Sequence, residues 1–356
     1  MSKATVIPFG PQHLVLPEPL HLDLVVQDET VVDVLPQIGF VHRGLEKLVE
    51  TRDYNQFIYI AERMGHSLGY AETVESLMGV EVPKRAEYLR VIWHELSRIH
   101  SHLLWLGLAA DAFGFESMFM HCWRLRERVL DLFEKTTGGR VILSVVKVGG
   151  VVRDIDANQM AEIVSVLDGI KDEYTQIMNT LLTDTSVKNR TVGVGHITTE
   201  DAAALSMVGP FARASNLPYD VRSFGRGAYG DLADFAPITA TEGDCYARVK
   251  VRCLEVLQSI EIIKELGAKI PAGDIEVAVK GAPADGAQAS NVLEQPRGEC
   301  YYYARGNGSK NLERMRMRTP TSQNLAGMTT ALAGCDLADV NMIVLTIDPC
   351  ISCTER

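Results

Sequence analysis

DPCISCTER, residues 348–356, is the most informative stretch of this 356-residue sequence. It places two thiols, Cys350 and Cys353, with two residues between them. Thiolates at this spacing can converge on one soft metal ion. The pair alone also fits a redox dithiol, half of a zinc site or two unrelated buried cysteines. Since only three residues follow Cys353, we expect any further ligands to come from far upstream.

Composition narrows the class of protein. Hydrophobic residues make up 46% of the sequence, which is enough for a substantial core, and the net charge of −11 argues against nucleic-acid binding. The first ten residues lack a signal-peptide pattern, and no stretch reaches the roughly 18 apolar residues of a membrane helix. We therefore expect membrane association only through partner subunits. The remaining cysteines are scattered and are expected to be buried thiols in a reducing compartment: Cys122, Cys245, Cys253, Cys300 and Cys335.

Hydrophobic periodicity predicts a mainly α fold. Helical spacing indicates helices over 53–79, 85–110, 117–135, 158–182, 243–266 and 323–333. Alternation and turn residues indicate a hairpin over 20–35, strands over 275–279 and 301–304, and a turn at 306–308. Residues 187–238 are rich in turn formers and are expected to be loops and short helices. The prediction is one domain over residues 1–356, a central helical bundle with small peripheral β elements.

Several motifs outside the C-terminal stretch share one resemblance. They are HRGLE at 42–46, EQPRGE at 294–299 and PTSQN at 320–324, with GPQH at 10–13, GVEVP at 79–83 and GDCYAR at 243–248. Together with DPCISC they resemble the large subunit of nickel–iron hydrogenases of the energy-converting, membrane-associated (Ech) type. The last three motifs also resemble the quinone-site subunit of respiratory NADH dehydrogenase, a relative of the same fold.

The resemblance implies a nickel–iron centre. In that family four cysteines hold nickel, and two of them bridge to an iron that carries cyanide and carbon monoxide. Cys350 and Cys353 match the C-terminal pair of these ligands. Soft, strongly donating thiolates suit a metal that must hold dihydrogen-derived ligands. A sequence that ends at Arg356 also resembles the family's product after its C-terminal tail has been cleaved.

The resemblance also supplies candidate residues around the iron. Cyanide accepts hydrogen bonds, so the pocket needs donors, and Arg297 and Thr321, which follows Pro320, match the donor positions. A guanidinium suits this role because it has several donors and stays charged. Asp348 is expected to hold this arginine in place.

One position departs from the family pattern. The family has Glu-Arg, then a Cys-Gly-x-Cys pair and then a histidine, whereas here Glu62-Arg63 runs directly into Met64-Gly65-His66. Either a cysteine-containing segment is missing from this sequence between Arg63 and Met64, or the protein has lost the pair and is a non-hydrogenase relative. We favour the first interpretation, because a protein without nickel would have little use for the C-terminal thiol motif. His66 then matches the histidine near the iron.

Two glutamates match further family positions. Glu18 resembles the proton-relay glutamate, although an ordinary surface carboxylate in a turn is the alternative. Glu46 matches a glutamate that binds magnesium near the C-terminus in many members. The usual C-terminal ligand there is histidine, so Arg356 puts a magnesium site in doubt, and an ion pair between Arg356 and a carboxylate is the expected substitute.

Three histidines close together in the sequence suggest a zinc site, but their spacing does not favour one. His94, His100 and His102 lie on one predicted helix, but their spacing is not His-Glu-x-x-His, and His100 and His102 do not share a helical face. We interpret them as core or interface histidines.

The leading hypothesis is the catalytic subunit of a nickel–iron hydrogenase that interconverts protons and electrons with dihydrogen. By resemblance it would exchange electrons with ferredoxin through a small iron–sulfur subunit and join further hydrophilic and integral membrane subunits at the cytoplasmic side of the membrane, coupling to ion translocation. The alternative is a nickel-free relative in a membrane oxidoreductase complex, with a quinone-like or sulfur-compound site. A third hypothesis is a structural subunit with a zinc site or redox dithiol at its C-terminus.

Overall fold

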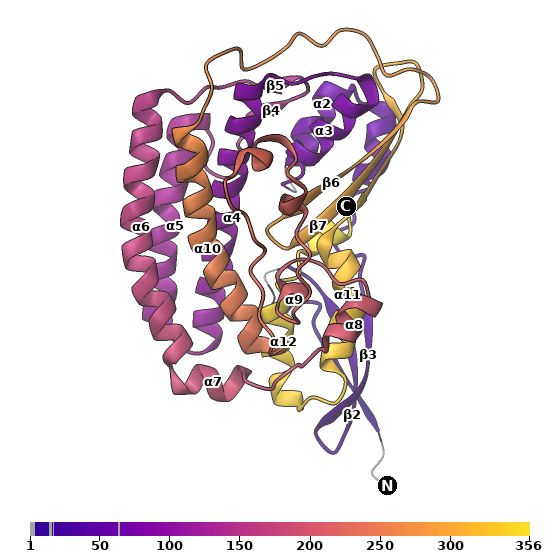
Figure 1. Cartoon of the computed structure of the whole chain (residues 1–356). Coiled ribbons are helices and arrows are strands. Elements are labelled where there is room, and N and C mark those ends of the chain that lie inside the picture. The colour runs from indigo at the N-terminus through magenta and orange to yellow at the C-terminus, as the bar shows by residue number, and fades with distance from the viewer. Residues whose placement is uncertain (1–3, 14–15, 17, 63–64) are drawn as a thin grey trace.

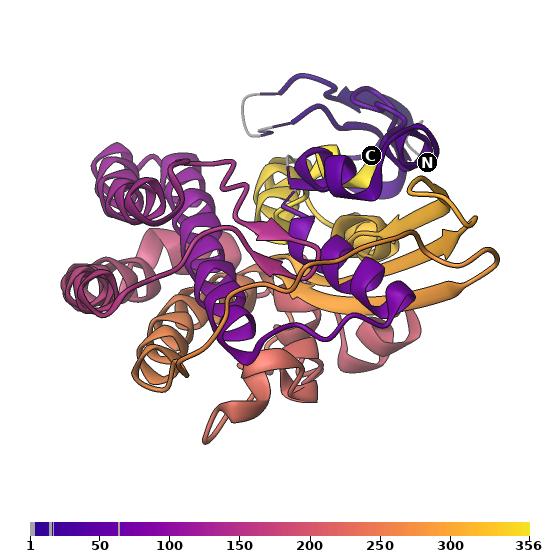
Figure 2. The same ribbon diagram turned by 90° about the horizontal axis from the view of Figure 1, so that it is seen from above.

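The computed structural model describes residues 4–13, 16, 18–62 and 65–356. Four long helices lie side by side and form a bundle (Figures 1 and 2). They are α4 (Lys84–Ala112), α5 (Glu116–Thr137), α6 (Ala157–Thr183) and α10 (Cys245–Ala268). Each prediction of these helices is confirmed to within a few residues at either end, and so is the mainly α fold class.

The helix boundaries follow from local chemistry. Asp156 and Gln159 form a reciprocal capping box at the start of α6, and Asp244 accepts the backbone N–H of Ala247 at the start of α10. Within α4 the fully buried side chains recur every three or four residues, which sets one broad face of the helix in the core: Leu89, Ile92, Leu96, Ile99, Leu103 and Leu106.

Shorter helices surround the bundle. The segment predicted as helical over 53–79 forms α2 (Tyr54–Glu62) and α3 (Ser67–Met78). The turn-rich region contains α7 (Thr185–Thr191), α8 (Thr199–Ala204), α9 (Gly209–Arg213) and the 3-10 turns η2 (Val221–Phe224) and η3 (Gly227–Asp231). The remaining helical elements are α1 (Leu45–Leu48), η1 (Val49–Thr51), α11 (Pro320–Leu332), η4 (Leu337–Asp339), α12 (Val340–Ile347) and α13 (Ile351–Thr354).

Two three-stranded antiparallel sheets lie beside the bundle. The first joins β1 (Thr5–Phe9), β2 (His21–Gln27) and β3 (Thr30–Gln37), and the second joins β6 (Gln288–Gln295), β7 (Gly298–Gly306) and β8 (Leu312–Arg318). A third, two-stranded ribbon pairs β4 (Val146–Lys147) with β5 (Gly150–Val151). The predicted β2–β3 hairpin is confirmed, and its turn residues Asp28 and Glu29 both have positive φ, as its tight turn requires.

One strand prediction is wrong. Residues 275–279 alternate like a strand, yet they form only a single bridge, between Glu276 and Gly150. The close approach of glycine backbone explains this: a Cβ at Gly150 would lie 2.2 Å from the carbonyl oxygen of Ile275. The strand that precedes β7 in the chain and pairs with it is β6, which begins nine residues after the predicted strand ends.

Two hydrophobic clusters organise the described residues. The larger one fills the bundle and reaches α2, α3 and the inner face of the β6–β8 sheet. The second packs the β1–β3 sheet against α8, α9, α11, α12 and α13. The C-terminal motif lies where these two clusters meet, because Ile351 belongs to the second cluster and Cys353 packs against the first. Among the described helices, none combines the length and apolar character needed to cross a bilayer.

We expect Gly69→Ala to destabilise the protein by about 1–3 kcal/mol, since overpacking a filled core costs that much. A Cβ at Gly69 in α3 would lie 2.2 Å from the ring of Tyr302, which is fully buried. Urea denaturation would measure the loss. Gly169→Ala in α6 is the matched control, because the nearest atom there is 3.7 Å away, and it should be neutral or slightly stabilising. Equal effects of the two substitutions would contradict the prediction.

Candidate functional site

A cavity of about 470 Å³ gathers most of the residues that the sequence singled out. Its wall includes both C-terminal thiols and side chains from four distant segments of the chain. The predicted site residues that line it are Glu18, His66, Arg297, Pro320, Thr321, Cys350 and Cys353. Glu46 and Asp348 do not line it.

The tip of the β6–β7 hairpin presents Arg297 to this cavity. Gln295 pairs with Gly298, so the turn consists only of Pro296 and Arg297. Gly298 has φ +128° and lies so close to Gly209 that a Cβ would meet the Gly209 nitrogen at 2.7 Å. Only glycine fits this crossing, and the hairpin tip is therefore fixed against α9.

Asp348 anchors the guanidinium, as expected from the sequence. Nε of Arg297 donates to the Asp348 carbonyl oxygen at 2.9 Å, and Nη2 donates to Asp348 Oδ1 at 2.9 Å. Asp348 is 7% exposed and Arg297 is 25% exposed. Burial opposes the charge on Arg297, but Asp348 and the two thiols raise its pKa above the ordinary value. The site therefore contains a permanent, rigidly held positive charge.

The two thiols are in contact. Sγ of Cys350 lies 2.9 Å from Sγ of Cys353, and the Cys350 backbone N–H donates to the Thr321 hydroxyl at 3.0 Å. The hydrogen bond from Cys353, and beyond it the Arg297 charge, lower the pKa of the Cys350 thiol against the opposing effect of burial. The pKa of Cys353 is raised. Cys350 is thus the thiol of the pair that ionises first.

Glu18 holds the backbone of the thiol motif. Its carboxylate accepts the N–H groups of Ile351 and Ser352, the latter at 3.0 Å, and also the Ser352 hydroxyl. Glu18 also lines the cavity. The structure therefore places it beside the thiols rather than as an isolated surface carboxylate. The neighbouring Pro17 lies outside the described residues.

His66 is a buried, neutral histidine at the cavity wall. Its Nδ1 lies 2.6 Å from the Tyr302 hydroxyl, while Nε2 is buried and makes no hydrogen bond to the part of the chain that the structure describes. Burial, and then the charge of Arg356, lower the pKa of His66 to about 4. At neutral pH, Nε2 of this ring can thus act as either a hydrogen-bond donor or an acceptor, depending on the tautomer.

Glu46 pairs with Arg356, which is the substitute that the sequence suggested for a magnesium site. Arg356 Nε donates to Glu46 Oε1 at 2.8 Å, and Arg316 lies 3.0 Å from Oε2. Burial would raise the pKa of Glu46, but Arg356, the Met317 N–H and Arg316 together lower it. Both oxygens of Glu46 are thus already used by the chain itself.

We expect Glu46→Gln to lower the free energy of unfolding at pH 7 by about 1 kcal/mol, as for a partly exposed charge-assisted bond. Since the folded pKa of Glu46 lies below 4.5, its contribution is present above pH 4.5 and is lost as pH falls through the folded pKa. Unfolding curves at several pH values should therefore show the variant losing less stability on acidification. Glu50→Gln, whose Lys47 partner is exposed, is the control and should change little.

The described residues do not by themselves fit a four-thiolate nickel centre. No group of three His, Cys, Asp or Glu side chains among them could hold a metal ion, and only two thiols face the cavity. The Arg63–Met64 junction, where the sequence departs from the family pattern, lies outside the described residues. Its flanks Glu62 and Gly65 line the same cavity as the thiols. The described residues on either side of the departure therefore belong to the wall of the site.

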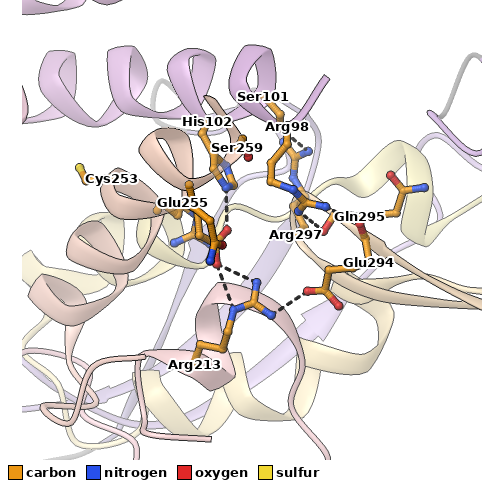
Figure 3. A network of polar contacts seen from close by, with 12 residues as sticks. Arg98, Ser101, His102, Arg213, Cys253, Glu255, Ser259, Glu294, Gln295 and Arg297 are labelled. Atoms are coloured by element: carbon orange, nitrogen blue, oxygen red, sulfur yellow. Dashed lines mark hydrogen bonds and ion pairs between the residues drawn. The ribbon is translucent and has the colours of Figure 1, made fainter. Parts of the chain in front are cut away.

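A buried ion-pair network next to the site was not predicted from the sequence. Figure 3 shows Arg213 between Glu255 and Glu294, with Arg98, Gln295 and Arg297 close by. The ion pairs extend further through Arg98, Arg222, Glu95 and Asp220. These side chains come from α4, α9, η2, α10 and β6, so no local spacing connects them. The local signals are Glu95 and Arg98, three positions apart on α4, and Asp220 and Arg222, two positions apart at η2.

His94 and His102 of α4 are buried core residues, as the sequence indicated, whereas His100 is partly buried. His94 Nε2 lies 2.8 Å from the Glu294 carbonyl oxygen, and His102 Nε2 lies 2.9 Å from Glu255 Oε2. Burial lowers the pKa of His94 to about 4 and that of His100 to about 3. His94 and His100 line the cavity as neutral rings, and the three histidines form no zinc site.

Comparison with known proteins confirms the family resemblance. Residues 112–284 and 276–356 match the family of the 49 kDa subunit of respiratory-chain NADH dehydrogenase. The chain is 37% identical to a carbon monoxide-induced hydrogenase of Rhodospirillum rubrum, over 98% of this chain and 99% of that one. It is 36% identical to membrane-bound hydrogenase subunit alpha of Pyrococcus furiosus, over 98% and 87%. A solved chain of the membrane-bound sulfane sulfur reductase, an archaeal respiratory membrane complex, superposes with a TM-score of 0.93 at 29% identity, covering 99% and 98%.

Proposed function

Because this chain belongs to the family of the 49 kDa subunit of respiratory-chain NADH dehydrogenase and its hydrogenase relatives, we propose that it is the catalytic subunit of an energy-converting nickel–iron hydrogenase. One observation carries the proposal: a single cavity gathers Cys350, Cys353, Arg297 and Thr321. Its wall also contains Glu62 and Gly65, which flank the position where the resembling family carries its other two cysteines.

The proposal requires two further thiolates, because two thiols do not hold the metal pair. We propose that a cysteine-containing segment between Arg63 and Met64 supplies them at the cavity wall. When bound, the centre would supply the electron-rich metal at which dihydrogen is formed or split. The chain's own residues would bind and orient this group: Cys350 and Cys353 as ligands, and the Arg297 guanidinium as a donor to an anionic iron ligand such as cyanide. The Thr321 hydroxyl fixes the Cys350 backbone and is the second donor proposed for that pocket.

Protons and electrons need separate routes. We propose that the Glu18 carboxylate, hydrogen-bonded to Ile351 and Ser352, takes up and releases protons beside the thiols. Electrons would pass to ferredoxin through a small iron–sulfur subunit, since the described cysteines form no cluster site. Further hydrophilic and integral membrane subunits would hold the chain at the cytoplasmic side of the membrane and couple the reaction to ion translocation.

The thiol contact favours a second candidate, a nickel-free sulfur-compound reductase. Two thiols 2.9 Å apart can give up two electrons and two protons and form a disulfide. A sulfane sulfur atom that accepts both electrons and both protons leaves as hydrogen sulfide, which balances the reaction. Arg297 lies beside Cys350 and would stabilise the attacking thiolate. The structural similarity to the sulfane sulfur reductase complex is consistent with this candidate.

Metal analysis together with intact-mass measurement of the purified protein distinguishes the hydrogenase proposal from the sulfur-compound reductase candidate. The hydrogenase proposal expects about one nickel per chain and extra mass for a cysteine-containing segment at the 63–64 junction, with exchange of deuterium gas against water protons. A mass equal to the printed sequence, no nickel and no exchange would overturn it. Sulfide release from a polysulfide, abolished by Cys350→Ser, would then establish the second candidate.

A further inference from the structure

A second cavity, of about 530 Å³, adjoins the first and contains a buried carboxyl group that the proposed function does not use. Both cavities are lined by Leu68 and Arg90. Arg90 is 4% exposed and donates to both oxygens of Glu75, at 2.6 and 2.9 Å, so this ion pair lies in the wall between them. The buried carboxyl group in the second cavity is that of Glu294, which is 1% exposed.

Strand β6 links Glu294 to the first cavity. Glu294 lines the second cavity, whereas the next three residues along the chain, Gln295, Pro296 and Arg297, line the first. The Glu294 carbonyl oxygen accepts from Arg98 Nη2 at 2.6 Å, and Arg98 Nη1 donates to the Gln295 carbonyl oxygen at 3.0 Å. Glu294 is therefore held rigidly, one hairpin turn from the guanidinium beside the thiols.

The charge around Glu294 is not balanced. In the ion-pair network, the guanidiniums of Arg98, Arg213 and Arg222 match the carboxylates of Glu95, Asp220 and Glu255, and Glu294 is a fourth acid. Burial, and then the Asp220 charge, raise the pKa of Glu294 to about 7, against the opposing effects of Arg213 and Arg98. A group with this pKa changes its protonation near neutral pH, which few carboxyls do.

The groups that face Glu294 come from every neighbouring element. Its Oε1 accepts from Arg213 Nη1 at 2.7 Å, and its Oε2 accepts the Val221 N–H at 3.2 Å. The other charged or titratable side chains around it are Glu72 and Glu75 of α3, Arg90, His94, Glu95 and Arg98 of α4, Tyr219 before η2, Asp220 and Arg222 at η2, Arg226 before η3, Tyr229 of η3, Glu255 of α10 and Glu299 opposite it on β7. Of these, Glu72 is the other carboxyl of the second cavity with a raised pKa, mainly because of burial.

We propose that Glu294 is a proton-loading residue that exchanges protons with solvent through the second cavity and so buffers the charge of the redox site in the first. When negative charge is added beside Arg297, the Glu294 carboxylate takes one proton from water in the second cavity, and when that charge is removed the carboxyl returns it. One proton moves for one charge, and the electron comes from the redox partner that the proposed function already requires. The charge-buffering link to the redox site rests on the proposed function, whereas the exchange of protons between Glu294 and solvent does not.

Infrared titration of the full-length chain tests the exchange directly. A protonated-carboxyl band that disappears with a midpoint near pH 7 is expected in the unmodified protein and in Glu72→Gln, and it should be absent from Glu294→Gln. The variant keeps its fold because Arg213 retains Glu255 at 2.8 Å and Asp220 at 3.4 Å, and a thermal melt checks this. If the band is missing from the unmodified protein, persists in Glu294→Gln or disappears in Glu72→Gln, the proposal is overturned.

The pH profile of deuterium–proton exchange tests the link to the redox site. Glu294→Gln should lower the rate about tenfold or more and remove an inflection near pH 7, as general acid–base groups do. Glu72→Gln should keep the inflection. A Glu294→Gln profile that keeps it would reduce Glu294 to a structural role. Complete absence of exchange in the unmodified protein would contradict the proposed function and the charge-buffering link with it, while the infrared band would still decide whether Glu294 exchanges protons.

Discussion

Arg213→Leu is expected to lower the free energy of unfolding by at least about 3–5 kcal/mol, the typical loss when one partner of a buried ion pair is removed. Arg213 is fully buried and contacts three acids: Asp220, Glu255 and Glu294. Without it, Glu255 retains His102 as a partner and Asp220 retains Arg222, but Glu294 loses its only ion-pair partner among the described residues. Urea denaturation of the purified chain measures the effect.

The chain contains a matched control for this prediction. Arg140, after α5, also contacts three acids, but all of these groups are exposed: Glu127, Asp131 and Glu134. Arg140→Leu removes the same number of ion pairs from a site that water already solvates and should leave the unfolding curve unchanged. A loss for Arg213→Leu no larger than that for Arg140→Leu would show that burial of the network does not determine its contribution.

Arg297→Lys is expected to lower the rate of deuterium–proton exchange by about 10²–10³-fold, the usual result of removing one preorganised donor from an active site. Lysine keeps the charge but cannot donate to both the carbonyl oxygen and the carboxylate Oδ1 of Asp348 and still point a donor into the cavity. The exchange rate of the purified complex, corrected for its nickel content, is the measurement, since it separates reaction rate from metal loading.

Arg43→Lys serves as the control for that substitution. Arg43 Nη2 donates to the Ser352 carbonyl oxygen at 2.9 Å, so it also contacts the thiol motif, but it is exposed and does not line the cavity. Its replacement should leave the rate nearly unchanged. Similar losses in the two variants would mean that the backbone position of the motif, rather than a donor in the cavity, limits the reaction.

Much of the fold follows from the sequence because its signals are local. The α4 stripe predicted a helix over 85–110, and the helix spans Lys84–Ala112. Strand β1 was missed because it is short and contains Pro8, and its partner β2 lies more than ten residues away. The alternation at 275–279 was misleading, because its side chains pack without a ladder of backbone hydrogen bonds.

The sequence likewise predicted one part of the candidate site and not the other. Motif resemblance predicted Cys350, Cys353, Arg297 and Thr321, and the structure brings all four to one cavity. Motif resemblance could not predict Glu294 as a titrating group, although the residue lies within a recognised motif. The pKa of Glu294 depends on burial and on Asp220 and Arg213, which are over 70 positions away and approach only when η2 packs on β6 and α9 packs on β7. The roles proposed for Glu18 and His66 remain predictions.

The contacts of Glu355 have a consequence for the order in which the site is made. Its carboxylate accepts the N–H groups of Gly39 and Val41, and Gly39 lies 316 positions earlier in the chain. At about 5–20 residues per second, a ribosome needs about 15–60 s to make that stretch. During translation, the loop after β3 therefore emerges long before Glu355, whose carboxylate it will bind. The wall residues up to Val146 are therefore made well before the wall residues from Gln295 to Cys353.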